Sequence, residues 1–128
     1  MTTNLKLAIL DSEYTVHRFS PESEIPANAL TGNFLSITRT DDELSIVCDA
    51  DIPLNSDKSE SGWSCIRVLG PLDFGLTGIL AKIASVLAEA EISIFAISTY
   101  DTDYILVKKE KLMAAQETLL EAGYIFEN

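Results

Sequence analysis

Residues 69–78 read Leu-Gly-Pro-Leu-Asp-Phe-Gly-Leu-Thr-Gly, and this stretch decides how the second half of the chain is interpreted. It joins a strand-like run, residues 63–69, to a helix-like run, residues 79–90, through a loop that contains Gly75 and Gly78. Glycines at such a joint let backbone N–H groups approach a guest closely, and the start of a helix adds unpaired N–H groups and the positive end of its dipole. The stretch therefore predicts a place where a small anion, such as the carboxylate of an amino acid, can bind.

The second half of the chain has the order of a ferredoxin-like unit. Apolar residues recur at three- and four-residue steps in two segments, which predicts two helices, and Gly123 follows the second as a stop. Short runs rich in Ile, Val and Phe predict strands around them. The expected order is strand 63–69, helix 78–90, strand 92–99, strand 104–108, helix 111–122 and strand 124–126.

The first half has less helix. We expect a strand pair, residues 5–10 and 14–19, around Asp11-Ser12-Glu13, a short helix over residues 26–30, and a second strand pair, residues 34–40 and 43–48. The fold class is thus α+β: a ferredoxin-like βαββαβ second half with a related, helix-poor ββαββ first half packed against it. A polar stretch with Pro53 and Gly62 separates the halves. The expected division is residues 1–50, a linker at 51–62, and residues 63–128.

The sheet of the second half is apolar on both faces. Residues 92–97 and 104–107 carry apolar side chains at both alternating sets of positions. A sheet with helices on only one face normally has a polar second face. We therefore expect the second face to be covered, either by the first half of this chain or by a partner chain, which makes a homodimer possible.

Charge and cysteine content narrow the class of protein. The 128 residues carry a formal net charge of −11, which disfavours binding to nucleic acid and to anionic membrane surfaces. Cys48 and Cys65 form neither a disulfide framework nor a metal-ligand spacing. Residues 5–10 are too short for a signal peptide, and no apolar run approaches the roughly 20 residues of a membrane span. These features predict a cytoplasmic protein.

The sequence contains no recognisable catalytic constellation. It lacks the P-loop, dinucleotide-binding, zinc-binding and nucleophile-elbow patterns. His17 is the only histidine, so the sequence offers little basis for a Ser-His or Cys-His nucleophile, and a structural or solvent-facing role for His17 is favoured over a catalytic one. We expect no enzyme activity, no cofactor and no metal site.

The loop that follows residue 69 allows two interpretations. Its glycines either permit only a tight turn and close packing, or they expose N–H groups that hold a carboxylate while Asp73 accepts a ligand ammonium. Hydroxyl side chains that end the strand at residues 92–99 are placed to satisfy a polar guest. The candidate ligand-binding residues on these grounds are Leu72, Asp73, Phe74, Gly75, Leu76, Gly78, Ser98 and Thr99.

Three segments resemble a known family. Residues 36–48 (Ser-Ile-Thr-Arg-Thr-Asp-Asp-Glu-Leu-Ser-Ile-Val-Cys), residues 70–80 (Gly-Pro-Leu-Asp-Phe-Gly-Leu-Thr-Gly-Ile-Leu) and residues 92–107 are similar to those of small bacterial ACT-domain proteins, which pair a divergent first unit with a standard second one. The paired units also resemble those of cytosolic arginine sensors. The resemblance implies an effector held between ACT units by the loop after the first strand and by the neighbouring strand. Carried over by position, it adds Thr77 and Ile97 to the candidate site.

Two functions remain open on this evidence, with a third less supported. The first is a non-enzymatic sensor that binds a small ligand, an amino acid in the simplest case, and acts on an unidentified protein partner in trans. The second is a structural or dimerisation module with no metabolite ligand. A small enzyme that relies on carboxylate pairs is the third, and nothing in the sequence supports it directly.

Overall fold

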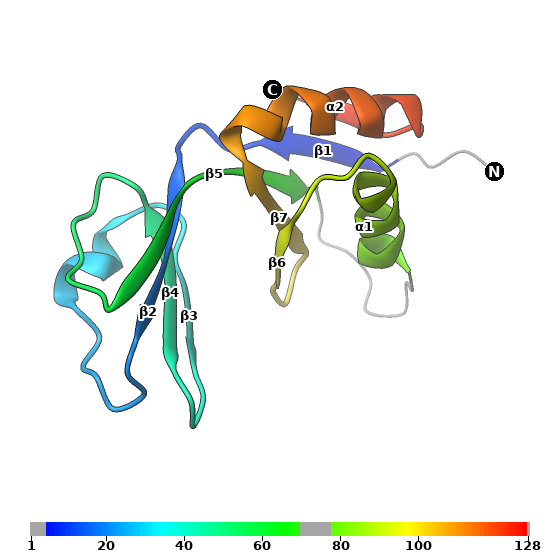
Figure 1. Ribbon diagram of the computed structural model, residues 1–128. Helices are drawn as coiled ribbons and strands as arrows, with labels where there is room; N and C mark the ends of the chain where they lie inside the picture. The colour runs from blue at the N-terminus through cyan, green and yellow to red at the C-terminus, as the bar shows by residue number, and fades with distance from the viewer. Residues whose placement is uncertain (1–4, 70–77, 128) are drawn as a thin grey trace. The chain divides into compact units, whose positions relative to one another are not determined.

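The computed structural model describes residues 5–69 and 78–127 (Figure 1). The chain divides into two compact units, one formed by Ser12–Trp63 and the other by Met1–Asp11 together with Ser64–Asn128. The elements within the described residues are β1 (Lys6–Ile9), β2 (Tyr14–Phe19), η1 (Ala27–Thr31), β3 (Ser36–Arg39), β4 (Leu44–Asp49), β5 (Lys58–Val68), α1 (Ile79–Glu89), β6 (Phe95–Ser98), β7 (Asp103–Lys108), η2 (Lys109–Lys111), α2 (Leu112–Glu121) and β8 (Ile125–Glu127).

The unit formed by residues 12–63 is an antiparallel sheet in the order β3-β4-β2-β5, to which β5 contributes its first half. The expected short helix is present as the 3-10 helix η1, which follows Pro26 and buries Ala29 completely. Alternation along β4 places Leu44, Ile46 and Cys48 on one face, where they form a core of this unit together with Phe19 of β2, while Val47 and Tyr14 are buried on the other face. The buried members of that core are Phe19, Ala29, Leu44, Ile46 and Cys48.

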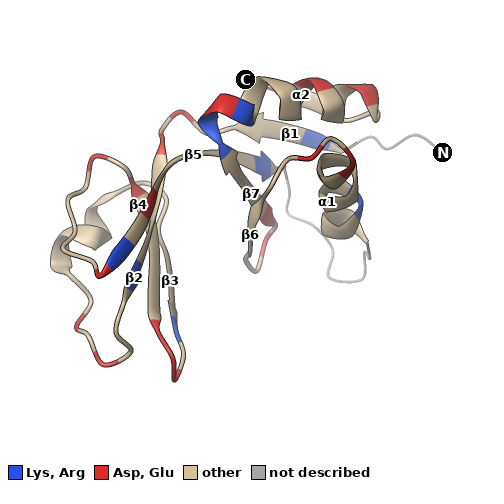
Figure 2. Cartoon of the chain, in the orientation of Figure 1, with Lys and Arg blue, Asp and Glu red and all other residues tan. Residues whose placement is uncertain are grey.

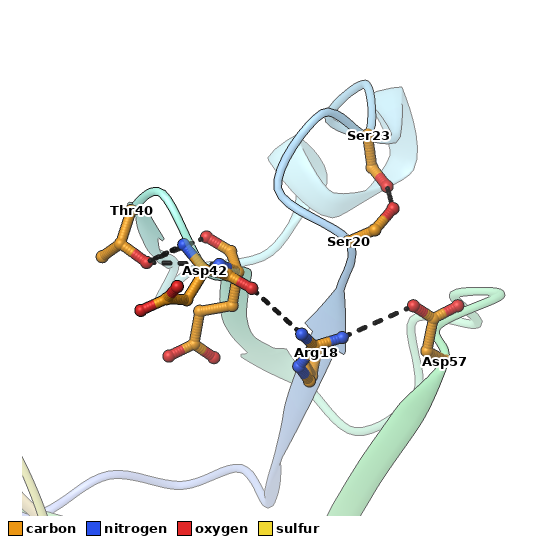
Figure 3. A network of polar contacts seen from close by, with 7 residues as sticks. Arg18, Ser20, Ser23, Thr40, Asp42 and Asp57 are labelled. Atoms are coloured by element: carbon orange, nitrogen blue, oxygen red, sulfur yellow. Dashed lines mark hydrogen bonds and ion pairs between the residues drawn. The ribbon is translucent and has the colours of Figure 1, made fainter.

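Polar contacts close one end of this unit (Figure 3). The Arg18 guanidinium donates to the backbone carbonyl of Asp42 at 3.0 Å and lies 3.7 Å from the carboxylate of Asp57. The Thr40 hydroxyl accepts the backbone N–H groups of Asp42 and Glu43 at 3.1 and 3.2 Å, so the turn between β3 and β4 is capped from within. Arg18 thereby links that turn to the segment that enters β5.

The second unit is a five-stranded sheet in the order β8-β1-β5-β7-β6. Strand β1 pairs antiparallel with β5, where Leu7 faces Val68, and parallel with β8, where Leu7 faces Phe126. The expected pairing of residues 5–10 with 14–19 is therefore wrong, because β1 and β2 each pair with β5, in its second and its first half, and not with one another. The Leu7 side chain is fully buried in the core of this unit, and both edges of β1 are hydrogen-bonded within it.

These pairings give unit boundaries that differ from the expected 1–50 and 63–128. The first eleven residues belong with the C-terminal part of the chain, because β1 completes its sheet. The expected linker at 51–62 ends inside β5, which begins at Lys58 and pairs there with β2. The boundary between the units lies within this single strand, after Trp63.

Helices α1 and α2 cover one face of the second sheet. Their buried residues, Ile83 and Leu87 on α1 and Ala115 and Leu119 on α2, pack in one core with β1, β5 and β7. The hydrophobic stripe that predicts each helix is therefore the stripe that faces the sheet. A glycine with positive φ precedes α1 and another follows α2: Gly78 has φ 78° and Gly123 has φ 103°.

Strand β7 is buried on both faces. Ile105 and Val107 point into the core beneath the helices, while Leu106 points to the opposite face and is also fully buried. On β6, Phe95 is paired with Leu106 and Ile97 with Tyr104, and both β6 side chains are half-buried. Leu106 is thus screened from water although it lies on the face away from the helices, while Tyr104 on the same face is half-buried.

Candidate functional site

The candidate site lies at one end of the second unit's sheet, where β5 and β6 end and where β7 and α1 begin. The Thr102 hydroxyl, in the turn between β6 and β7, donates to the backbone carbonyl of Val68 at 2.6 Å and is buried. Ser98 is paired with Asp103 across the hairpin. The hydrogen bond from Thr102 to Val68 fixes the hairpin turn to the end of β5.

Four of the ten predicted site residues lie within the described part of the chain. Gly78 starts α1 in a left-handed conformation, and a Cβ built there would meet no heavy atom within 4 Å. Ile97, Ser98 and Thr99 occupy the end of β6 and the start of the turn. The other six lie outside the described residues: Leu72, Asp73, Phe74, Gly75, Leu76 and Thr77.

The two hydroxyls proposed for a polar guest already have partners. Ser98 donates to the carboxylate of Asp103 at 2.6 Å, and Thr99 donates to the carbonyl of Thr102 at 3.0 Å while it accepts the Thr102 N–H at 3.3 Å. Thr99 therefore shapes the turn. Ser98 is exposed and Asp103 is half-buried, and a carboxylate that accepts one hydrogen bond can accept others, so this pair suits a cationic group such as an ammonium.

Two residues of this end, Thr102 and Asp103, are not among the ten predicted site residues. Thr102 sits between two aspartates, and the run Asp-Thr-Asp is typical of turn chemistry. Its buried hydrogen bond to Val68 depends on a strand more than thirty positions away, so no local signal reveals it. Asp103 is a turn residue by the same pattern, and only the register with Ser98 shows that the two side chains meet.

The titratable groups with shifted pKa values lie elsewhere and are buried. The ring of His17 bonds to Ser56 at 2.8 Å, and burial lowers its pKa below 6.5. Both cysteines are free and buried; burial raises the pKa of the Cys65 thiol to about 12, and it also raises that of Cys48, together with nearby Asp49. These groups favour the uncharged forms that suit a packed interior.

The described residues contain neither a metal-ligand cluster nor a membrane-spanning helix. Among the described residues, no group of three or more His, Cys, Asp and Glu side chains is arranged to hold a metal ion. Neither α-helix in that part of the chain has the length and apolar content to cross a membrane. Figure 2 shows many of the acidic residues in loops and on α2.

The fold of the second unit is a ferredoxin-like βαββαβ arrangement with β1 added between its outer strand and its first strand. A sequence model of the ACT domain matches residues 58–121, which is half of the chain, and a second model, of an N-terminal domain, matches residues 12–55. The chain belongs to the ACT domain family.

Known proteins resemble the chain to different extents. A crystal structure of a protein from Agrobacterium tumefaciens is 42% identical, with a TM-score of 0.90 over 98% of this chain and 93% of that one. The Homo sapiens protein named cytosolic arginine sensor for mTORC1 subunit 1 is 36% identical over 95 residues, 67% of this chain. The chain spans only 29% of that sensor's length. The regulatory subunit of aspartate kinase from Thermus thermophilus shares the fold alone, at 11% identity and a TM-score of 0.63 over 94% of this chain and 97% of that one.

Proposed function

We propose that the chain is a non-enzymatic regulatory module that binds a free amino acid and acts on a partner protein in trans. The observation that carries the proposal is the bond from Thr102 to the Val68 carbonyl, which holds the β6–β7 turn beside the end of β5. Membership of the ACT family and the name of the human relative, an arginine sensor, support a small-molecule ligand of this class.

The ligand chemistry follows from the groups at this end of the sheet. From the sequence we propose that residues 72–78, which precede α1, offer backbone N–H groups to a carboxylate. The Ser98–Asp103 pair has acceptors for an ammonium. We propose Asp73 as a further acceptor and Leu72, Phe74 and Ile97 as apolar contacts. An amino acid carries a carboxylate and an ammonium and therefore suits these groups.

The regulatory mechanism is linkage between ligand and partner. A ligand that binds one conformation of the protein better than another shifts the population toward that conformation and so changes the affinity for the partner. We further propose that the module works in the cytoplasm, as the human relative's name states for that protein, and as a homodimer whose contact covers apolar sheet surface. The partner is identified only as a protein whose affinity for the chain differs between the two conformations.

A thermal-shift panel of the free amino acids tests the proposal. A ligand at a hundred times its Kd adds about 2.7 kcal/mol to the free energy of unfolding. For a chain of this length that is a rise in Tm on the order of 10 °C. If no amino acid raises Tm at millimolar concentration, the amino-acid sensor is refuted and the structural module is favoured.

The Gly75→Leu variant tests whether the loop is the binding site. A leucine side chain there should block the approach of the ligand and abolish the thermal shift. The matched control is Gly62→Leu in the other unit, where φ is +80° and no heavy atom lies within 4 Å of an added Cβ. The control should lose stability through backbone strain yet keep the shift. A shift retained in Gly75→Leu places the ligand elsewhere.

A further inference from the structure

Helix α2 carries large apolar side chains on its outer side. Ala115 and Leu119 of this helix are buried in the core, whereas Met113 is 78% exposed and Leu120 is 48% exposed. Met113 and Leu120 are seven positions apart, which is about two turns, so they lie in one line along the helix. A spacing of seven between apolar residues is the spacing with which one helix contacts another.

The charges at the two ends of α2 are opposed to its dipole. A helix dipole favours acidic side chains at the N-terminus and basic side chains at the C-terminus. Here Lys109 and Lys111 outnumber Glu110 at the N-terminal end, and Glu121 is the last residue of the helix. Figure 2 shows blue at the η2 end of α2 and red toward its other end. This order costs the single helix stability, but it suits a second helix that runs in the opposite direction.

Lys111 and Glu121 are available for such a contact. Both residues are exposed, and neither forms an ion pair with any residue in the ranges 5–69 and 78–127. An antiparallel helix would bring a lysine beside a glutamate at each end of the contact, and it would also align the two dipoles in opposite directions.

We propose that α2 binds α2 of a second copy of this chain, packed antiparallel around a two-fold axis between Gln116 and Glu117. In this register, Met113 of each copy lies opposite Leu120 of the other copy. Lys111 of each copy then lies next to Glu121 of the other. The argument for a second copy is that the surface of α2 is complementary to itself in both charge and apolar contact.

The contact is weak and depends on concentration. Glu117 is exposed and lies beside the proposed axis, so the carboxylates of the two copies repel one another. Two helices of 10 residues also bury less than the roughly 1,200–2,000 Å² of a standard protein interface. The inference goes beyond the proposed function, because it involves no ligand residue. It also lies on the outer side of the helices, whereas the homodimer proposed above forms through sheet surface.

Sedimentation equilibrium of the full chain, from about 10 μM to about 1 mM, tests the apolar part of the contact. At the upper concentrations the wild type should approach twice the mass of the Met113→Gln/Leu120→Gln variant, which lacks the apolar contact. Both side chains are exposed, so this variant should keep a Tm close to that of the wild type. Leu30→Gln, at a 60% exposed leucine of η1, is the matched control and should associate like the wild type.

Charge reversal tests the antiparallel register. Lys111→Glu places two acidic side chains together at each end of the contact and should weaken association about tenfold. The Lys111→Glu/Glu121→Lys variant restores opposite charges at both ends and should associate within about threefold of the wild type. Glu117→Gln removes the repulsion at the axis and should strengthen association.

Three results would overturn the inference, and none of them depends on ligand binding. The first is an equal mass for the wild type and the Met113→Gln/Leu120→Gln variant at every concentration. The second is a control, Leu30→Gln, that associates as weakly as that variant. The third is a Lys111→Glu/Glu121→Lys variant that stays as weak as Lys111→Glu. The amino-acid panel is a separate measurement, so failure of the proposed function leaves these results unchanged.

Discussion

Replacing Thr102 by valine should loosen the end of the sheet where the proposed site lies. The Thr102 side chain is 4% exposed, and its hydroxyl donates to the Val68 carbonyl at 2.6 Å. Valine has the same shape but no hydroxyl, so the carbonyl of Val68 loses a buried donor. The substitution removes one interaction and leaves the packing volume almost unchanged.

The size of the effect follows from that geometry. A net hydrogen bond is worth about 1 kcal/mol, and a buried carbonyl left without its donor costs about 1–3 kcal/mol. The extra methyl group of valine offsets part of this loss, at about 0.8 kcal/mol if it is fully buried. We expect the free energy of unfolding to fall by about 1–2 kcal/mol, and Tm by roughly 3–8 °C.

The assay is urea unfolding, with the midpoint and the m-value compared between variants. Thr102→Ser keeps the hydroxyl and should retain most of the stability that valine loses. Thr38→Val makes the same chemical change at an exposed position of β3 and should stay within about 0.5 kcal/mol of the wild type. If Thr102→Val is as stable as Thr38→Val, the hydrogen bond to Val68 does not hold the β6–β7 turn beside the end of β5. The proposed ligand site then lacks the contact on which it rests.

Two further predictions concern buried titratable groups. Because burial lowers the pKa of His17, the unfolded chain binds a proton that the folded chain rejects, and stability should fall as the pH drops through 6.5. His17→Gln should reduce this loss, measured as the change in urea midpoint between about pH 8 and about pH 5; an unchanged pH dependence would contradict the reasoning. With a pKa of about 12, Cys65 is thiolate in only about one molecule in ten thousand at pH 8, so iodoacetamide should label it on unfolding and hardly before, as followed by mass spectrometry. Rapid labelling of Cys65 in the folded protein would show that it is accessible.

Most elements of the fold could be predicted because their signals are local. The stripe on α1, the stop at Gly123 and the apolar run of β7 are each readable within a dozen residues. The place of β1 could not be predicted in this way. A strand of four residues followed by a polar turn fits a hairpin equally well, and only the distant strands β5 and β8 decide its partners.

The candidate site remains a prediction, because six of its ten residues lie outside the described part of the chain. The end of β6 and the start of α1, where Ser98 and Gly78 lie, follow from the order of elements in the sequence. The role of each hydroxyl depends on the register across the hairpin and on the packing of the turn against β5. The burial of the Arg67 Nε atom, which has no hydrogen-bond partner among the described residues, likewise depends on what surrounds it in space.

The position of β1 has a consequence for how the chain folds during synthesis. β1 is made well before its partners β5 and β8, of which β8 is the more distant in the chain. The unit of residues 12–63 holds all of its strands by the time residue 63 is made, so it can fold while the remaining sheet is still incomplete. Closing the second sheet requires contacts of high sequence separation, and these are slow to form. Until β8 arrives, one edge of β1 is unpaired, and this is the stage at which the nascent chain is most exposed to aggregation.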